Sequence, residues 1–264
     1  MIPADFLIEH ADLIATCAGP APRRGKAQGE ISPLRDGVVA AHRGVITYVG
    51  PREHLAEHVE VDRGATRIDA RGCTVLPGFV DPHTHVVFAG DRRGELQRRL
   101  AGATYREIAA AGGGIAATVA ATRRASEDEL IASTRPRLDE MLAGGTTTCE
   151  AKSGYGLTTG SELTQLRAIS RLNAEHAIDL VSTFLGAHDV PGEYRERRDD
   201  YVALLIDAMI PQVVDEALAE WCDVFCEAGA FTAEESTRIL RAASAAGLKP
   251  RIHADEFGPS GGSL

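Results

Sequence analysis

From residue 73 onward, the sequence alternates between short apolar segments and longer segments with a helical pattern. Five apolar segments predict β-strands, which we expect at 73–85, 146–152, 179–188, 222–227 and 249–256. A helical segment follows every one of these strands except the last. Strands that alternate with helices are typical of a parallel sheet built from βα units. The sequence therefore predicts an α/β fold for this part of the chain.

Local signals place several of the helices. Ser126 with Glu129, and Thr232 with Glu235, have the spacing of capping boxes and predict helices that begin there. Further helices are expected at 104–111, 115–125, 161–176 and 201–218. Two of the expected helices contain a proline that should kink them, Pro136 and Pro211.

The N-terminal part has a mostly β pattern, so we expect a first domain at 1–76 and a second at 77–264. In the first domain, Arg43-Gly44 has the form of a two-residue hairpin turn. The strands expected there are 6–16, 38–42, 45–49 and 66–69. These are too few for a complete sandwich.

Composition excludes some classes of partner. The 264 residues carry a net charge of -10 and no long block of Lys or Arg, which argues against nucleic acid. No stretch of 18 apolar residues predicts a membrane span. The N-terminus has no basic segment of a signal peptide, and the five cysteines form no disulfide framework, so we expect a cytoplasmic location. The sequence leaves open whether the chain forms a homodimer.

His83 and His85 stand one residue apart at the end of the first expected strand. Residues i and i+2 of a strand project to the same side, about 6.5 Å apart. Neutral imidazole is the commonest metal ligand in proteins. We therefore expect the pair to bind a metal ion, the alternative being two partly solvated histidines without metal.

Other chemically active residues also fall near the ends of expected strands, namely Lys152, Tyr155, His188, Glu227, His253 and Glu256. A (β/α)₈ barrel builds its active site at this edge. A doubly wound sheet binds ligands there too, but no G-x-G-x-x-G run follows the first strand. An eight-unit barrel has three βα units more than the five expected here.

The run P-G-F-V-D-P-H-T-H at 77–85 resembles the first-strand signature of the amidohydrolase superfamily of metal-dependent hydrolases. Five further runs have the order and spacing of one family within it, the imidazolonepropionases, which act in the third step of histidine degradation. They are F-A-G-D-R at 88–92, G-G-G-I at 112–115, E-A-K-S-G-Y-G-L at 150–157, F-L-G-A-H at 184–188 and H-A-D-E-F-G at 253–258. The resemblance covers essentially the whole chain.

The resemblance implies a (β/α)₈ TIM-type barrel, of which this chain has about the first five βα units. Residues 1–76 would be the N-terminal part of a small β-sandwich. The implied reaction is hydrolysis of 4-imidazolone-5-propanoate, a small-molecule substrate, to N-formimino-L-glutamate. Carried over by position, His83, His85 and His253 match metal ligands, and the substrate-binding residues are Arg92, Tyr155, His188 and Glu256. The family's aspartate ligand at the end of the eighth strand lies beyond this sequence.

The chemistry of the residues agrees with these roles. A metal ion polarises a cyclic amide and activates water, and a carboxylate can then move protons. The leaving ring nitrogen needs a proton, so Glu256 and His188 are the candidate catalytic residues. Arg92 can bind the propionate carboxylate with two hydrogen bonds. Lys152 lies on strand two, whereas the superfamily's metal-bridging lysine lies on strand four, so we expect one divalent metal, Zn or Fe.

Two alternatives remain open at this point. One is another amidohydrolase, acting on a cyclic amidine or as a purine-type deaminase, and the other is a non-catalytic metal-binding fragment. Arg92 and Tyr155 discriminate between an imidazolonepropionase and another amidohydrolase, since a carboxylate-bearing substrate needs the arginine. We expect the 264 residues by themselves to be inactive, because the barrel would be open after strand five and would lack its carboxylate ligand.

Overall fold

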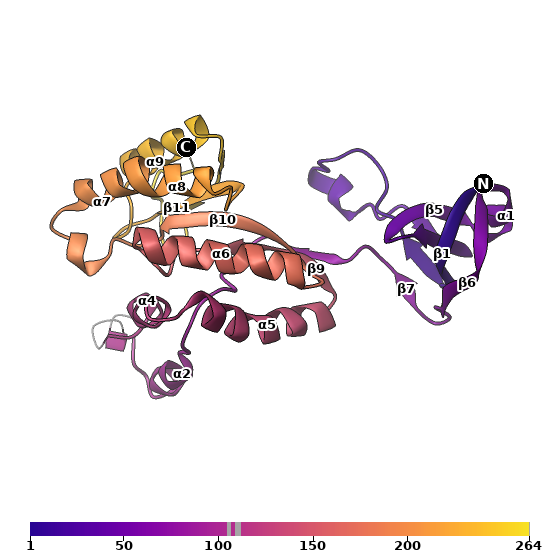
Figure 1. Cartoon of the computed structure of the whole chain (residues 1–264), viewed down its shortest axis with the longest axis horizontal. Coiled ribbons are helices and arrows are strands. Elements are labelled where there is room, and N and C mark those ends of the chain that lie inside the picture. Colours follow the sequence, from indigo (N-terminus) through magenta and orange to yellow (C-terminus); the bar gives the residue numbers. More distant parts are fainter. Residues whose placement is uncertain (105–106, 109–111, 264) are drawn as a thin grey trace. The chain divides into compact units, whose positions relative to one another are not determined.

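The computed structural model describes residues 1–104, 107–108 and 112–263. The helix expected at 104–111 lies largely outside these described residues. The chain divides into two compact units, Met1–Gly78 and Phe79–Leu264, and each is described by itself (Figure 1).

The first unit contains two small β-sheets. One has the order β5 (Val45–Pro51), β4 (Gly37–His42), β1 (Ile2–Glu9), β6 (Val59–Asp69), and the other the order β3 (Pro33–Leu34), β2 (Leu13–Ala15), β7 (Thr74–Val75). The hairpin of β4 and β5 is confirmed, and both residues of its turn, Arg43 and Gly44, have positive φ. This backbone twist matches that of the flanking strands. Short helical turns complete the unit: η1 (Gly25–Gly29), η2 (Arg52–His54) and α1 (Leu55–His58).

The strand expected at 6–16 is two strands, because the chain turns sharply between β1 and β2. His10 has φ of +62° at this turn, a conformation that ends a strand. Buried side chains of β1, β4 and β6 form the core of the larger sheet, and these are Ala4, Leu7, Val38, Ala40 and Val59.

The second unit is built on a parallel sheet whose strands pair in the order of the sequence. The order is β8 (Phe79–Asp81), β9 (Thr146–Lys152), β10 (Asp179–Ala187), β11 (Trp221–Cys226), β12 (Lys249–Pro250), and β13 (His253–Ala254) also pairs with β11. Every pairing is parallel. Each βα unit thus adds one strand beside the previous one, as in the wall of a (β/α)₈ barrel.

Helices follow the strands, and each overlaps a helical segment expected from the sequence except the helix at Arg93–Leu100, which was not predicted. They are α2 (Arg93–Leu100), α4 (Ile115–Thr122), α5 (Glu127–Ala143), α6 (Thr159–Glu175), α7 (Arg198–Leu204), α8 (Ile210–Asp215) and α9 (Ala233–Ala245), with short turns at η3 (Gly192–Tyr194) and η4 (Leu205–Met209). Both predicted capping boxes are present, at Ser126 and at Thr232. Pro136 lies inside α5 without ending it. The expected disturbance at Pro211 takes the form of the π-helical turn η4, directly before α8.

The first and last expected strands are each broken in two. The expected strand at 73–85 is β7 in the first unit and β8 in the second, and β8 ends at Asp81, before both histidines. Pro77 and Pro82 lack the N–H that a continuous ladder requires. The chain nevertheless continues along β9, because the Lys152 N–H donates to the Thr84 carbonyl at 3.1 Å. The strand expected at 249–256 is likewise β12 and β13.

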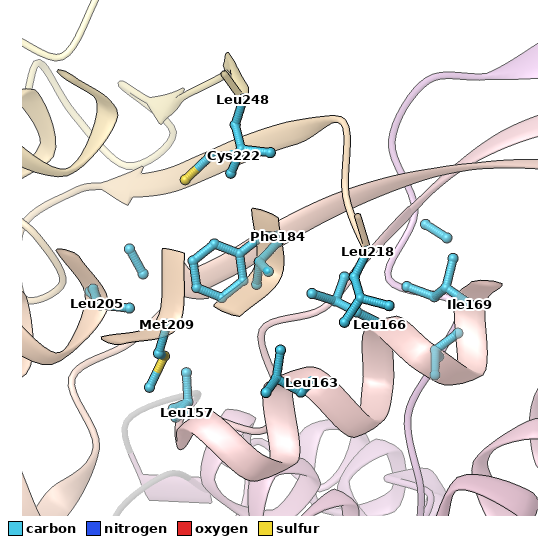
Figure 2. Close-up of a cluster of buried hydrophobic side chains, with 14 of the residues drawn as sticks. Leu157, Leu163, Leu166, Ile169, Phe184, Leu205, Met209, Leu218, Cys222 and Leu248 are labelled. Carbon is cyan, nitrogen blue, oxygen red and sulfur yellow. The ribbon is translucent and has the colours of Figure 1, made fainter. Parts of the chain in front are cut away.

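The two faces of the sheet differ because side chains alternate along each strand. Phe184 of β10 packs among Leu163 and Leu166 of α6 and Met209 of η4, in one large buried cluster (Figure 2). On β9, Cys149 and Ala151 belong to this cluster. Their neighbours Glu150 and Lys152 therefore project to the opposite face, where the polar residues gather.

Candidate metal centre

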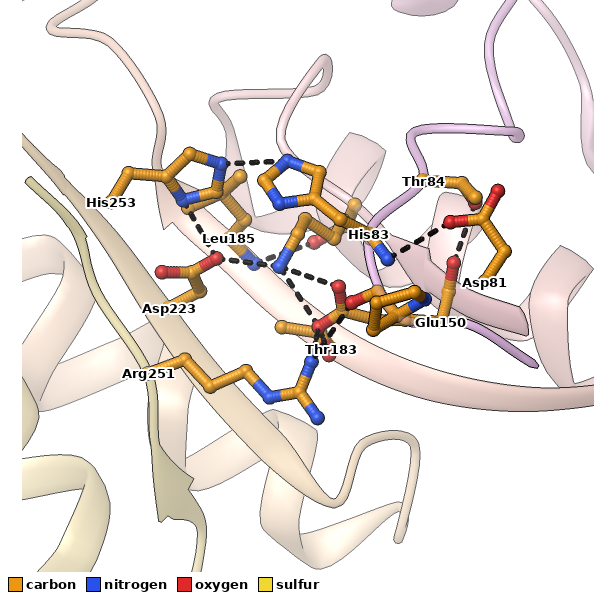
Figure 3. Close-up of polar contacts among 12 residues, drawn as sticks. Asp81, His83, Thr84, Glu150, Thr183, Leu185, Asp223, Arg251 and His253 are labelled. Carbon is orange, nitrogen blue, oxygen red and sulfur yellow. Dashed lines mark hydrogen bonds and ion pairs between the residues drawn. The ribbon is translucent and has the colours of Figure 1, made fainter. Parts of the chain in front are cut away.

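Three histidines from distant parts of the chain come together at the carboxyl end of the sheet. His83 and His85 follow β8, and His253 begins β13. One nitrogen from each ring lies within 4.8 Å of the other two. The Nε2 atoms of His83 and His253 are 2.9 Å apart (Figure 3). The predicted ligands thus form one group of the size that a single divalent ion needs.

Burial and neighbouring charges lower the pKa of two of these rings, His83 and His85. Burial, followed by the neighbouring His188 and His253, lowers the pKa of His85 to about 2. Burial and then the charge of His253 lower the pKa of His83. The Nδ1 of His85 is buried without a hydrogen-bond partner among the described residues. A buried nitrogen without a partner is costly, and coordination of a metal ion would satisfy it. The residues present therefore fit a metal ion.

His253 contacts a buried network of charged side chains. The Nδ1 of His253 lies 2.9 Å from Oδ2 of Asp223, a residue of β11 that is 1% exposed (Figure 3). Burial acts to raise the pKa of Asp223, but the hydrogen bond with His253 and the charges of His253 and Lys152 outweigh it, and the pKa is lowered. With Nδ1–H bound to this carboxylate, the Nε2 of His253 is left to coordinate a metal. Such an orienting carboxylate is typical of metal-binding histidines.

Lys152 continues the network rather than contributing a ligand. Its ammonium lies 2.6 Å from Asp223 and 2.8 Å from Glu150, and its side chain is 2% exposed. Glu150 also accepts from Thr183 at 2.6 Å and from Arg251. Lys152 is therefore committed to two carboxylates, which agrees with the expectation that it does not bridge two metals.

A cavity of about 680 Å³ opens beside the histidines. It brings three of the predicted substrate-binding residues, Arg92, His188 and Glu256, to the same space as the candidate ligands. Arg99, Ile115, Phe225 and Phe257 complete its lining. Tyr155 packs against the rings of His85 and His188, with ring centroids 5.6 and 5.2 Å away. Six of the seven residues predicted for the site thus line one cavity, and the seventh, Tyr155, packs against two of them.

His188 is held in one tautomer. Its Nδ1 lies 2.8 Å from the carbonyl oxygen of Gly154, so this nitrogen carries the proton and donates it. Burial lowers the pKa of His188 to about 4, although the bond to Gly154 acts in the opposite direction. The ring is therefore neutral near pH 7, and its Nε2 presents a lone pair. In this form His188 accepts a hydrogen bond from a ligand, which disfavours it as the proton donor.

Arg92 stands at the N-cap of α2 and is already partly engaged. Its Nε donates to Glu95 at 2.9 Å, and the other oxygen of Glu95 accepts from the N–H of Gly114 at 2.7 Å. The glycine run at 112–114 thus helps to place the arginine. The two Nη nitrogens of Arg92 can still bind a carboxylate.

Some residues have roles that the sequence did not reveal. Glu227 was expected among the functional residues, but it accepts the N–H groups of Ala228 and Phe257 and so holds the loop that carries Glu256. Asp223 and Glu95 were missed. A single charged residue within the apolar strand 221–226 is the signal that could have found Asp223.

Comparison with solved structures supports the fold. The chain matches an atrazine chlorohydrolase of Arthrobacter aurescens in a zinc complex with a TM-score of 0.56 and 14% identity, covering 96% of this chain and 53% of that one. It matches a 5-methylcytosine deaminase of Klebsiella pneumoniae with a TM-score of 0.58 and 16% identity, covering 95% and 51%. The chain therefore has the fold of part of a (β/α)₈-type barrel, like these hydrolases, and the predicted fold class is confirmed.

Curated relatives show a closer similarity in sequence. The chain is 50% identical over 264 residues to the imidazolonepropionase of Symbiobacterium thermophilum, covering 100% of this chain and 62% of the relative. It is 51% identical over 262 residues to that of Geobacillus thermodenitrificans, covering 98% and 62%. The resemblance to the imidazolonepropionases is thereby confirmed, and the chain spans about 62% of their length.

No protein-family model matches the chain. Within the described residues, no helix has the length and apolar character needed to cross a membrane.

Proposed function

We propose that this chain supplies the metal-binding and much of the substrate-binding machinery of an imidazolonepropionase. The reaction is hydrolysis of the cyclic amide of 4-imidazolone-5-propanoate to N-formimino-L-glutamate. The observation that carries the proposal is that His83, His85 and His253 line the same cavity as Arg92 and Glu256. The curated relatives bear the name of this activity.

The proposed cofactor is one divalent metal ion, Zn or Fe, bound by the three histidines. Three imidazoles suit either ion. When bound, the ion would supply Lewis-acid chemistry, which polarises a carbonyl and activates water. Asp223 holds His253 in the tautomer that coordination needs, so the protein prepares this ligand in advance.

The remaining residues bind the substrate and move a proton. Arg92 binds the propionate carboxylate through its two Nη nitrogens. Tyr155 helps to bind the substrate from its position against the rings of His85 and His188. The Nε2 of His188 accepts a hydrogen bond from an N–H of the imidazolone ring. Glu256 lines the cavity in an exposed position. It takes a proton from the attacking water and delivers it to the ring nitrogen as the amide bond breaks.

The test uses two proteins. One is the 264-residue chain. The other is a fused chain, in which this chain is joined to the part of the Symbiobacterium relative that it does not match. Both are loaded with Zn²⁺ or Fe²⁺, and conversion of 4-imidazolone-5-propanoate to N-formimino-L-glutamate is measured. We expect turnover by the fused chain, loss of turnover on chelation, and a large loss in its Glu256→Gln variant.

The control is a panel of cyclic amidines and purine-type rings that lack a carboxylate. A folded, metal-loaded fused chain that deaminates a panel member and leaves the imidazolone intact would overturn the proposal in favour of another amidohydrolase. Turnover by the 264-residue chain alone would contradict the expectation that these residues are inactive by themselves.

A further inference from the structure

The loop between β9 and α6 carries Tyr155, and the side chain of Glu162 binds its backbone. Glu162 lies in the first turn of α6 and is fully buried. One carboxylate oxygen accepts the N–H of Gly154 at 3.0 Å, and the other accepts those of Gly156 and Leu157 at 2.8 Å each. A single carboxylate thus binds three of the four N–H groups at residues 154–157.

Gln165, one turn further along α6, binds the fourth. Its side-chain oxygen accepts the N–H of Tyr155 at 3.1 Å, and its nitrogen donates to the carbonyl of Val87 at 2.8 Å. On the carbonyl side of the loop, Arg123 donates to Gly156 at 2.7 Å and to Leu157 at 3.2 Å. The loop is therefore held from both sides by side chains, although it belongs to no helix or strand.

Gly154 connects this arrangement to the cavity. Its N–H binds Glu162, and its carbonyl accepts the Nδ1–H of His188. It has φ of +108°, which favours glycine, and a Cβ there would lie 2.9 Å from the carbonyl oxygen of Leu185. A small movement of Gly154 would therefore change the bond that selects the tautomer of His188.

The hydrogen bonds between the loop and Glu162 suit an ionised carboxylate. An ionised carboxylate only accepts hydrogen bonds, whereas a protonated one must also donate. Three backbone N–H groups and the hydroxyl of Ser153 all act on Glu162. Burial raises the pKa of Glu162, and these hydrogen bonds oppose the increase. Hydrogen bonds to an ionised acceptor are about twice as strong as neutral ones.

We propose that Glu162 is a positioning residue for the substrate cavity. By holding the loop 154–157, it fixes the ring of Tyr155 against His85 and His188, and through Gly154 it keeps the proton of His188 on Nδ1. This proposal rests on the proposed function for its effect on turnover, but its effect on His188 needs no substrate.

The test replaces Glu162 with Gln, which has nearly the same shape. A glutamine offers one acceptor oxygen, so at least one of the loop N–H groups would face an NH₂ group instead. Glu175→Gln is the matched control, because Glu175 lies at the other end of α6, is exposed, and pairs with Arg135 on α5. Displacement of reacting groups by about 1 Å can cost about 100-fold in rate. In the fused chain we expect Glu162→Gln to lower kcat/KM by about 100-fold at unchanged metal content, and Glu175→Gln to leave it unchanged.

The second readout is the ¹⁵N spectrum of labelled histidines in the 264-residue chain, with the signals of His188 assigned from their loss in His188→Gln. We expect the parent and Glu175→Gln to show the proton on Nδ1, and Glu162→Gln to show a mixture of tautomers. If Glu162→Gln does not fold, Gly156→Ala takes its place, since the added Cβ would lie 2.6 Å from the backbone of α6 and displace the loop from the other side.

A folded Glu162→Gln protein with the parent's His188 spectrum and kcat/KM would overturn the proposal. So would equal losses in Glu162→Gln and Glu175→Gln, or a loss of kcat/KM explained by lost metal. If the parent fused chain does not hydrolyse the imidazolone, the proposed function fails, and the His188 spectrum alone decides the role of Glu162.

Discussion

Replacing Lys152 with methionine should destabilise the chain by about 3 kcal/mol, because two buried carboxylates would lose their shared cation. The ammonium of Lys152 lies 2.8 Å from Glu150 and 2.6 Å from Asp223, and all three side chains are at most 2% exposed. Methionine keeps much of the apolar stem, so the change in packing is small. The loss is therefore mainly electrostatic.

The magnitude follows from what remains after the substitution. Removing one partner of a buried ion pair costs about 3–5 kcal/mol, since the other charge stays buried. Arg251 and Thr183 would still hold Glu150, and His253 would still hold Asp223. These contacts place the expected loss at the lower end of that range.

The measurement is urea unfolding of the metal-free chain, followed by far-UV circular dichroism. Lys249→Met is the matched control, because Lys249 pairs with Glu220 at 3.2 Å where both side chains are more than half exposed. It also lies over the ring of Trp221, 5.0 Å from the ring centroid. An exposed pair and a cation–π contact each contribute about 1 kcal/mol or less, so the control should lose under about 2 kcal/mol. Equal losses in the two variants would refute the assignment of Lys152 to a buried charge network.

Three further predictions concern the site. Replacing both His83 and His85 with Ala in the fused chain should abolish stoichiometric metal in elemental analysis, and one tightly held ion in that variant would contradict the ligand assignment. Arg92→Ala should lower kcat/KM in the fused chain far more for the acid than for its amide analogue, whereas equal losses would show that Arg92 does not bind the carboxylate. In the metal-free chain, the free energy of unfolding should fall as the pH drops below about 6.5, the pKa of an unfolded histidine. The pKa of His188 is about 4 when folded, so between these values the unfolded state binds a proton that the folded state does not. His188→Gln should flatten this dependence by up to about 1.4 kcal/mol per pH unit, and an unchanged slope would contradict the buried neutral ring.

Much of the fold was predictable because its signals are local. The alternation of strand and helix indicated a parallel sheet, and in such a sheet the carboxyl ends of all strands meet at one edge. His83, His85 and His253 could therefore be placed together although 170 residues separate the first from the last. The capping boxes at Ser126 and Thr232 were also predictable, since each depends on residues three positions apart.

The supporting contacts could not be predicted in the same way. Lys152 and Asp223 are 71 residues apart, and no local pattern says which strand end a buried lysine will face. In the sequence, Glu162 resembles an ordinary acidic residue in the first turn of a helix, where a negative charge interacts favourably with the helix dipole. Its burial depends on the loop that folds back over it, which is set by tertiary contacts. The break between β7 and β8 was missed because an apolar run through Pro77 and Pro82 resembles a continuous strand.

Two separate supports hold the candidate metal centre, and they should respond differently to substitution. Glu150, Lys152 and Asp223 form a charged layer on the face of the sheet opposite the apolar cluster. Loss of this layer should lower both the stability of the chain and its metal affinity. On the side of the cavity, Glu162 and Gln165 fix a loop by its backbone, and its loss should change the placement of Tyr155 and His188 while the metal is retained. A Lys152→Met protein that keeps full metal affinity, beside a Glu162→Gln protein that loses it, would reverse this assignment. The division follows from the structure because the charged layer contacts His253 directly, whereas the rings of Tyr155, which the loop carries, and of His188, which the loop binds, contact the candidate ligand His85.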